Sequence, residues 1–219
     1  GILQSAFGFQ GQKCSACSRV IVLDSLYERI CARLADAADS LIVADPSLPQ
    51  SEIGPVINGA AKERILNTID QGRQWGSLYH QTDVSSHTGG HYVAPTLFRD
   101  VAPDSPLAQE EIFGPVVCLM PAKDLDQAFA IANSTRYALT GGFYSRSPAH
   151  LKRAAEAFRV GNLYLNRGIT GALVHRQPFG GHKMSGIGFK TGGRDYLLQF
   201  VEAKCITENT LRRGIAPLS

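Results

Sequence analysis

The sequence contains no apolar run close to the ~20 residues that a membrane-spanning helix requires. It also does not begin with a charged segment followed by an apolar one, as a secretory leader does. Cysteine is scarce and odd in number, with five in 219 residues, whereas a secreted disulfide scaffold is normally shorter, richer in cysteine and even in count. The net charge is only +3 and the basic residues are scattered, so we expect no nucleic-acid partner. What remains is an ordinary globular composition, for which we expect a reducing, cytoplasmic compartment.

Short β-branched or apolar runs alternate with amphipathic stretches along most of the chain. The runs predict strands at 19–23, 78–80, 91–98 (interrupted by Pro95), 115–120, 141–144 and 162–166. The amphipathic stretches predict helices over about 25–41, 60–75, 124–133 and 148–158. Strands and helices that alternate in this way predict an α/β fold with a mostly parallel sheet flanked by helices.

Two finer features are expected from the same patterns. Ser25 with Glu28, and Asp124 with Gln127, have the spacing of side-chain caps at the starts of the first and third helices. A last strand is predicted at Phe200–Thr207, beyond a glycine-rich stretch. We expect that strand to leave the main sheet and to pair with another segment or another subunit.

The segment GQKCSACSRV (11–20) carries two cysteines, Cys14 and Cys17, three positions apart. A zinc site needs about four ligands, but no second cysteine pair is present and the six histidines lie singly, so we expect no metal. A redox dithiol of the thioredoxin type follows the first strand of a small domain, whereas this pair precedes one. Inert packing is the usual state of a free cysteine and fits the other three. Cys14 is different, because it follows glycine and polar residues beside Lys13, where a thiolate is favoured.

Five segments, FGFQGQKCSACSRV, EEIFGPVV, GNLYLNR, TGALV and PFGGHKMSG, together resemble the aldehyde dehydrogenase superfamily in their order and spacing. The resemblance extends over essentially the whole chain and is closest to the L-glutamate γ-semialdehyde dehydrogenases, also called 1-pyrroline-5-carboxylate dehydrogenases. The C-terminal TENTLRRGIAP is similar to the end of that module in bifunctional proline utilisation proteins. The resemblance implies NAD as cofactor and a small aldehyde as substrate. It fits both a monofunctional parent and one with a proline dehydrogenase domain upstream in the same chain.

In this family a cysteine thiolate attacks the aldehyde, hydride passes to NAD, and water releases the acid from a thioester. The resemblance matches Cys14 to that nucleophile. It matches Glu111 to the carboxylate that accepts hydrogen bonds from the nicotinamide ribose, and Phe113 to the aromatic ring beside the nicotinamide. Without the resemblance, Glu110 and Glu111 would be interpreted as a solvated acidic pair before a strand.

The resemblance also implies a substrate site. In this subfamily, backbone N–H groups of a loop of small residues bind the α-carboxylate of the substrate. Gly171 and Ala172 match those donors, Ser15 matches a hydroxyl contact, and Phe179 matches an aromatic ring that packs on the aliphatic part of the substrate. The alternative is that the loop is a simple turn after the strand at 162–166.

The resemblance divides the chain into a catalytic domain, 1–195, and a C-terminal strand and tail, 196–219, which we expect to serve homo-oligomerisation. It implies that the NAD-binding domain, the glutamate general base and the asparagine of the oxyanion hole precede Cys14 in a longer parent chain. Two other functions remain open at this point. One is an aldehyde dehydrogenase for a different aldehyde, and the other is a non-catalytic oligomerisation module that keeps the fold.

Overall fold

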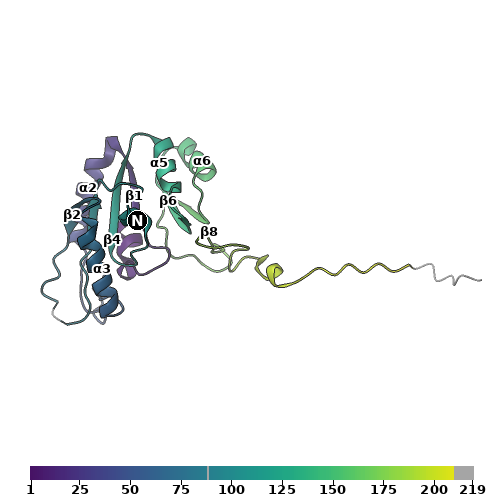
Figure 1. The fold of residues 1–219 in the computed structure, drawn as a ribbon, viewed down its shortest axis with the longest axis horizontal. Coiled ribbons are helices and arrows are strands. Elements are labelled where there is room, and N and C mark those ends of the chain that lie inside the picture. The colour runs from purple at the N-terminus through teal and green to yellow at the C-terminus, as the bar shows by residue number, and fades with distance from the viewer. Residues whose placement is uncertain (88, 210–219) are drawn as a thin grey trace, which may run out of the picture.

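The chain folds into helices interspersed with short strands, as Figure 1 shows for the computed structural model, which describes residues 1–87 and 89–209. The helices are α1 (Ile2–Phe7), α2 (Asp24–Asp39), α3 (Gly59–Gly72), α4 (Pro106–Gln109), α5 (Leu125–Asn133) and α6 (Pro148–Ala157), with 3-10 turns η1 (Gly8–Gly11) and η2 (Tyr196–Phe200). The strands are β1 (Arg19–Leu23), β2 (Ser77–Gln81), β3 (Thr96–Arg99), β4 (Val116–Ala122), β5 (Tyr137–Ala138), β6 (Thr140–Phe143), β7 (Asn162–Leu165) and β8 (His182–Lys183). None of the helices in the described ranges is long and apolar enough to cross a bilayer.

The main sheet has four strands in the order β1-β4-β3-β2. β4 pairs in parallel with both β1 and β3, and β2 joins the edge antiparallel to β3. The predicted α/β fold with a mostly parallel sheet is therefore confirmed. Four further strands form two small sheets, the parallel pair β6–β7 and the antiparallel pair β5–β8.

Two apolar clusters bury the main sheet on its two faces. Val20 and Val22 of β1 and Leu119 of β4 pack with residues of α1 and α2. Cys118 and Met120 of β4 pack on the opposite face with residues of α3 and α5. Successive residues of a strand point to opposite faces, so a central strand covered on both sides is apolar throughout. This explains the continuous run VVCLM in β4.

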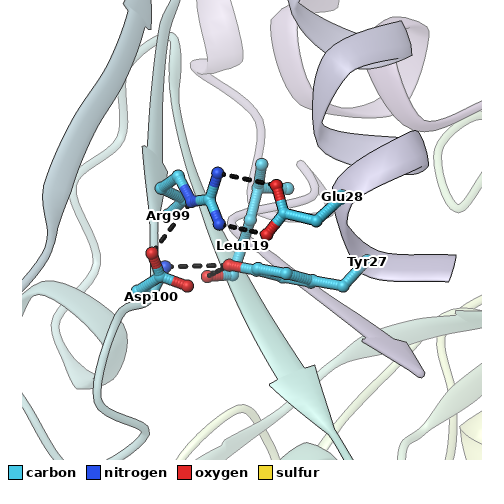
Figure 2. A network of polar contacts seen from close by, with 5 residues as sticks. All are labelled: Tyr27, Glu28, Arg99, Asp100 and Leu119. Carbon is cyan, nitrogen blue, oxygen red and sulfur yellow. Dashed lines mark hydrogen bonds and ion pairs between the residues drawn. The ribbon is translucent and has the colours of Figure 1, made fainter. Parts of the chain in front are cut away.

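A polar network connects α2 to the end of β3 and to the middle of β4 (Figure 2). Arg99 forms a two-pronged ion pair with Glu28 of α2, one contact measuring 3.0 Å, and its Nε lies 2.8 Å from the carboxylate of Asp100. The buried Tyr27 hydroxyl donates to the Leu119 carbonyl at 3.1 Å and accepts from the Asp100 N–H at 2.8 Å. The Tyr27 hydroxyl thus provides a partner for the Asp100 N–H just beyond β3 and for the Leu119 carbonyl within β4.

One of the two predicted helix caps is confirmed and the other is wrong. Asp124 accepts a hydrogen bond from the Gln127 N–H at 2.8 Å, and the Gln127 side chain accepts from the Lys123 N–H at 2.8 Å. In contrast, α2 begins one residue before Ser25, at Asp24, and makes no side-chain cap hydrogen bond. Glu28 is engaged by Arg99 instead, so a tertiary ion pair replaces the local cap.

The strand predicted at Phe200–Thr207 is also wrong for the single chain. Residues 201–209 have no regular secondary structure, and the tail runs away from the folded body in Figure 1. The apolar side chains of Phe200, Val201 and Ile206 are all more than 60% exposed. A strand exists only beside a hydrogen-bonded neighbour, and no described segment of the chain lies beside this one. The end of the TENTLRRGIAP segment, 210–217, lies outside the described residues.

Candidate active site

The loop that carries Cys14 connects η1 to β1 and is held by one hydrogen bond to α1 and by one within the loop. The Cys17 N–H donates to the Ser5 carbonyl in α1 at 2.9 Å, and the Ala16 N–H donates to the Lys13 carbonyl at 3.0 Å. Cys14 lies between these contacts and is exposed. Its side chain lines a cavity of about 1250 Å³ between β1 and β6.

Cys17 differs from Cys14 in burial and in chemistry. Burial raises the pKa of the Cys17 thiol to about 11, and the thiol lies 3.6 Å from the Arg19 carbonyl, to which it donates. A thiol with that pKa is protonated at neutral pH and is a poor nucleophile and a poor metal ligand. Cys31 and Cys118 are buried, as predicted for inert cysteines, whereas Cys205 is exposed and lies in no strand.

A metal centre finds no support in the described ranges, 1–87 and 89–209. No group of three or more histidine, cysteine, aspartate or glutamate side chains there is arranged to hold a metal ion. Both cysteines of the CxxC pair line the cavity, but Cys14 is exposed, whereas Cys17 is partly buried and packs against the apolar cluster beside β1.

Glu111 and Phe113 line the same cavity as Cys14. They lie in the loop between α4 and β4, and both are exposed. This loop is held by two arginines: Arg136 contacts the carboxylate of Glu110 at 2.6 Å, and Arg64 of α3 donates to the Ile112 carbonyl. The backbone therefore presents Glu111 and Phe113 to the cavity while their neighbours anchor the loop.

The predicted substrate residues occupy a different place. Gly171 and Ala172 follow β7 in a loop whose start is tied to α1, because the Ile169 N–H donates to the Ser5 hydroxyl at 3.1 Å. Ile169 lines the cavity, but Gly171 and Ala172 do not. Gly171 is exposed with φ +79°, and no atom lies within 4 Å of the position that a Cβ would take. Among the described residues, the N–H groups of Gly171 and Ala172 donate to no protein acceptor.

Ser15 and Phe179 are also not among the residues that line the cavity, although the neighbours of Ser15 in the sequence, Cys14 and Ala16, are. Ser15 is 8% exposed, and its carbonyl accepts from the Thr140 hydroxyl at 3.4 Å. Phe179 is half-buried and exchanges two backbone hydrogen bonds of 2.9 Å with Thr191. The structure thus places Cys14, Glu111 and Phe113 around one cavity. None of the four predicted substrate residues lines it.

Sequence reasoning missed Ser5, which joins two of the predicted site segments. Its carbonyl holds the Cys17 N–H and its hydroxyl holds the Ile169 N–H. Ser5 is 3% exposed although it is polar. The sequence shows a serine in an apolar helix, which is too common a pattern to single it out.

Comparison with known proteins identifies relatives over most of the chain. Residues 1–206 match the model of the aldehyde dehydrogenase family. The chain is 47% identical over 207 residues to a 1-pyrroline-5-carboxylate dehydrogenase of Geobacillus sp. (strain WCH70), an alignment that covers 94% of this chain and 40% of that protein. The chain therefore spans about two fifths of the length of the curated relatives it matches.

Two solved structures are similar over most or all of the chain. Proline utilization A (PutA) from Bdellovibrio bacteriovorus, inactivated by N-propargylglycine, has a TM-score of 0.91 and 56% identity and covers 100% of this chain and 23% of its own. A 1-pyrroline-5-carboxylate dehydrogenase from Thermus with bound NAD has a TM-score of 0.85 and 45% identity, over 92% of this chain and 39% of its own.

Proposed function

Since this chain belongs to the aldehyde dehydrogenase family, we propose that a full-length protein containing it oxidises L-glutamate γ-semialdehyde to L-glutamate, the second step of proline catabolism. The observation that carries the proposal is that Cys14, Glu111 and Phe113, from two separate loops, line one cavity. Relatives named 1-pyrroline-5-carboxylate dehydrogenase support this choice of substrate.

Cys14 is the nucleophile in this proposal. Its sulfur forms a bond to the aldehyde carbon, and the carbonyl oxygen takes the negative charge. Loss of a hydride from that carbon leaves a thioester on Cys14, and water then breaks the carbon–sulfur bond to release the acid and regenerate the thiol. Cys17 takes no part, because burial holds its thiol protonated.

The chain offers a binding site for the α-carboxylate of the substrate. A buried carboxylate needs donors, since its desolvation without partners costs several kcal/mol. The N–H groups of Gly171 and Ala172 meet that need, because they are not used by the described part of the chain. The Ser15 hydroxyl and the Phe179 ring complete the proposed site, by a hydrogen bond and by apolar packing respectively.

NAD is the proposed cofactor, and when bound it accepts the hydride. The residues present fit its nicotinamide end: Glu111 offers an exposed carboxylate to ribose hydroxyls, and Phe113 offers an aromatic face, 37% exposed, on the same cavity as Cys14. We propose that the phosphates and adenine bind to a domain outside these 219 residues. Calorimetry on this chain is then expected to show weak NAD binding or none, and micromolar binding would contradict that division.

We further propose that residues 196–219 serve assembly, beyond a catalytic domain at 1–195. The exposed apolar residues of the tail support this, because association removes such side chains from water. Sedimentation velocity is expected to show homo-oligomers whose fraction grows with concentration, and a strict monomer at high concentration would count against it. The similarity to PutA supports a proline dehydrogenase domain upstream in the same protein, and we keep a cytoplasmic location as part of the proposal.

The proposed function is tested by steady-state kinetics on the full-length protein with NAD. The two substrates are L-glutamate γ-semialdehyde and an aliphatic aldehyde of the same chain length without the α-carboxylate. We expect kcat/KM to be at least about tenfold higher for the semialdehyde, because each charge-assisted hydrogen bond contributes ~1.5–3 kcal/mol. Equal values for the two substrates would refute the substrate assignment, and the absence of NADH formation with either would refute the activity.

A further inference from the structure

The residues just before Cys14 have an unusual backbone conformation. Phe9 (φ 59°), Gln10 (φ 58°) and Gly11 (φ 67°) are three consecutive residues in the left-handed region, and two of them are not glycine. A non-glycine residue in that region is strained, and it persists only where its surroundings hold it there. Contacts from outside this left-handed turn, residues 9–11, must therefore stabilise it.

The two glutamine side chains on either side of Gly11 both reach the segment Gly54–Ile57. Gln12 Oε1 accepts a hydrogen bond from the Ile57 N–H at 3.0 Å. The Gln10 amide, oriented so that both of its partners are satisfied, accepts from the Gly54 N–H at 2.7 Å and donates to the Phe9 carbonyl at 3.0 Å. Two side chains two positions apart therefore bind two amides three positions apart.

These contacts complete the hydrogen bonding of the Gly54–Ile57 segment. The segment has three N–H groups, because its second residue is a proline. The Val56 N–H donates to the His91 carbonyl at 2.9 Å, and the other two donate to Gln10 and Gln12. Gly54 is buried, so its N–H would be left without a partner if Gln10 were removed.

The Gly54–Ile57 segment is itself held in place by core packing and by its connection to α3. Val56 is 3% exposed in the core, and the segment leads directly into α3, whose first turn is capped by the Asn58 side chain at 2.9 Å from the Ala61 N–H. On its other side the turn abuts the Glu111 loop, because a Cβ on Gly11 would lie 2.2 Å from the Gly114 carbonyl oxygen. The turn is thus braced against α3 and against the loop that carries Glu111 and Phe113.

We propose that Gln10 and Gln12 are positioning residues that hold the Cys14 loop on the Gly54–Ile57 segment. This inference rests on the proposed function only in taking Cys14 as the nucleophile. Cys14 follows Gln12 by two residues, so the hydrogen bond to Ile57 restrains the backbone immediately before the reacting sulfur. Loss of that bond is expected to let the thiol sample positions from which it cannot attack, since a misplacement of about 1 Å can reduce a rate about 100-fold.

The test uses Gln12, because replacing Gln10 would leave the buried Gly54 N–H without an acceptor and could unfold the chain. Gln12→Met keeps the length of the side chain but removes the oxygen acceptor, whereas Gln12→Glu keeps an acceptor. Gln74→Met is the matched control, because Gln74 is exposed and its side chain makes no hydrogen bond with the described residues. All variants carry Cys205→Ser, so that a nitroxide label enters at the exposed Cys14.

In the 219-residue chain, Gln12→Met is expected to narrow the electron paramagnetic resonance spectrum of the label on Cys14. It is also expected to speed hydrogen exchange of the Ile57 amide about fivefold, the factor that the loss of one hydrogen bond predicts. Gln12→Glu and Gln74→Met are expected to retain the parent spectrum and exchange rate. An unchanged spectrum or exchange rate in Gln12→Met, or a Gln12→Glu variant as mobile as Gln12→Met, would overturn the proposal.

In the full-length protein, Gln12→Met is expected to lower kcat about tenfold with little change in KM. The pH dependence of kcat/KM should be unchanged, because the substitution adds no charge. A mobile Cys14 with an unchanged kcat would overturn the positioning role. If the unsubstituted full-length protein oxidised no aldehyde, the proposed function would fail, while the spectra and exchange rates of the 219-residue chain would still decide whether Gln12 holds Cys14.

Discussion

Replacing Gly171 by valine perturbs the proposed carboxylate site with little effect elsewhere. Gly171 has φ +79° in an exposed loop, and a Cβ at this position would meet no atom within 4 Å. The new Cβ therefore causes no clash, and we expect the effect of the substitution to come from the backbone. A β-branched residue is strongly disfavoured at positive φ, so the loop is expected to rotate away from this conformation and to withdraw the N–H groups of Gly171 and Ala172 from the substrate.

The size of the effect follows from the hydrogen bonds lost. One or more charge-assisted hydrogen bonds, at ~1.5–3 kcal/mol each, correspond to a decrease of roughly ten- to hundredfold in kcat/KM. The decrease applies to L-glutamate γ-semialdehyde, whereas an aliphatic aldehyde without the α-carboxylate never used these donors and should lose little. The assay is NADH formation by the full-length Gly171→Val variant with both substrates.

A control is provided by Gly89, which is also exposed and where a Cβ would also meet no atom within 4 Å, but which has no positive φ. Gly89→Val is expected to leave both substrates unaffected. If Gly171→Val lowers kcat/KM for the two substrates by the same factor, the loop has a structural role only. The assignment of glutamate semialdehyde would then lose its main structural support.

Two further predictions concern stability. Because burial raises the pKa of the Cys17 thiol from 9.0 to about 11, the folded chain binds that proton more tightly than the unfolded chain. The free energy of unfolding should therefore stay constant up to about pH 9 and decrease toward pH 11. Urea titrations at several pH values should show a smaller decrease for Cys17→Ala than for the unsubstituted chain. An equal decrease would contradict the raised pKa of Cys17. Tyr27→Phe should lower the free energy of unfolding by about 1–3 kcal/mol, because it removes the acceptor of the Asp100 N–H and one of the donors to the Leu119 carbonyl. The exposed Tyr144→Phe should change it by less than about 0.5 kcal/mol, and equal effects would argue against the network in Figure 2.

Local patterns predicted most of the fold. The run RVIVL is β1 within its predicted bounds, and the Asp124–Gln127 cap begins α5. These features depend on neighbouring residues alone, namely alternation, apolar spacing and a capping side chain. The short strands β5 and β8 were not predicted, because two residues carry no periodic signal and their pairing joins segments more than 40 residues apart.

The errors arose where a partner distant in the sequence decides the outcome. Glu28 has the right spacing to cap α2 with Ser25, but Arg99 of β3 takes its carboxylate. Residues 200–207 have strand-like composition, but a strand also needs a neighbour, and the described chain supplies none. Propensity cannot reveal either of these tertiary effects.

The candidate site also combines features that the sequence predicted with features that depend on residues distant in the sequence. The family resemblance selected Cys14, Glu111 and Phe113, and the structure places all three on one cavity. The supports of the site were not predictable from the residues, because they are side-chain contacts to distant backbone groups. Ser5 holds Ile169 across 164 positions, and Gln12 holds Ile57 across 45.

The identity of the nucleophile is tested most directly by comparing Cys14→Ala and Cys17→Ala in the full-length protein. The measurement is the steady-state rate of NAD-dependent oxidation of L-glutamate γ-semialdehyde by the two variants. Cys14 is exposed on the cavity, whereas burial raises the pKa of Cys17 to about 11. The account predicts that Cys14→Ala abolishes oxidation and that Cys17→Ala retains most of it. Comparable losses in the two variants would contradict a single nucleophile and would favour a dithiol mechanism.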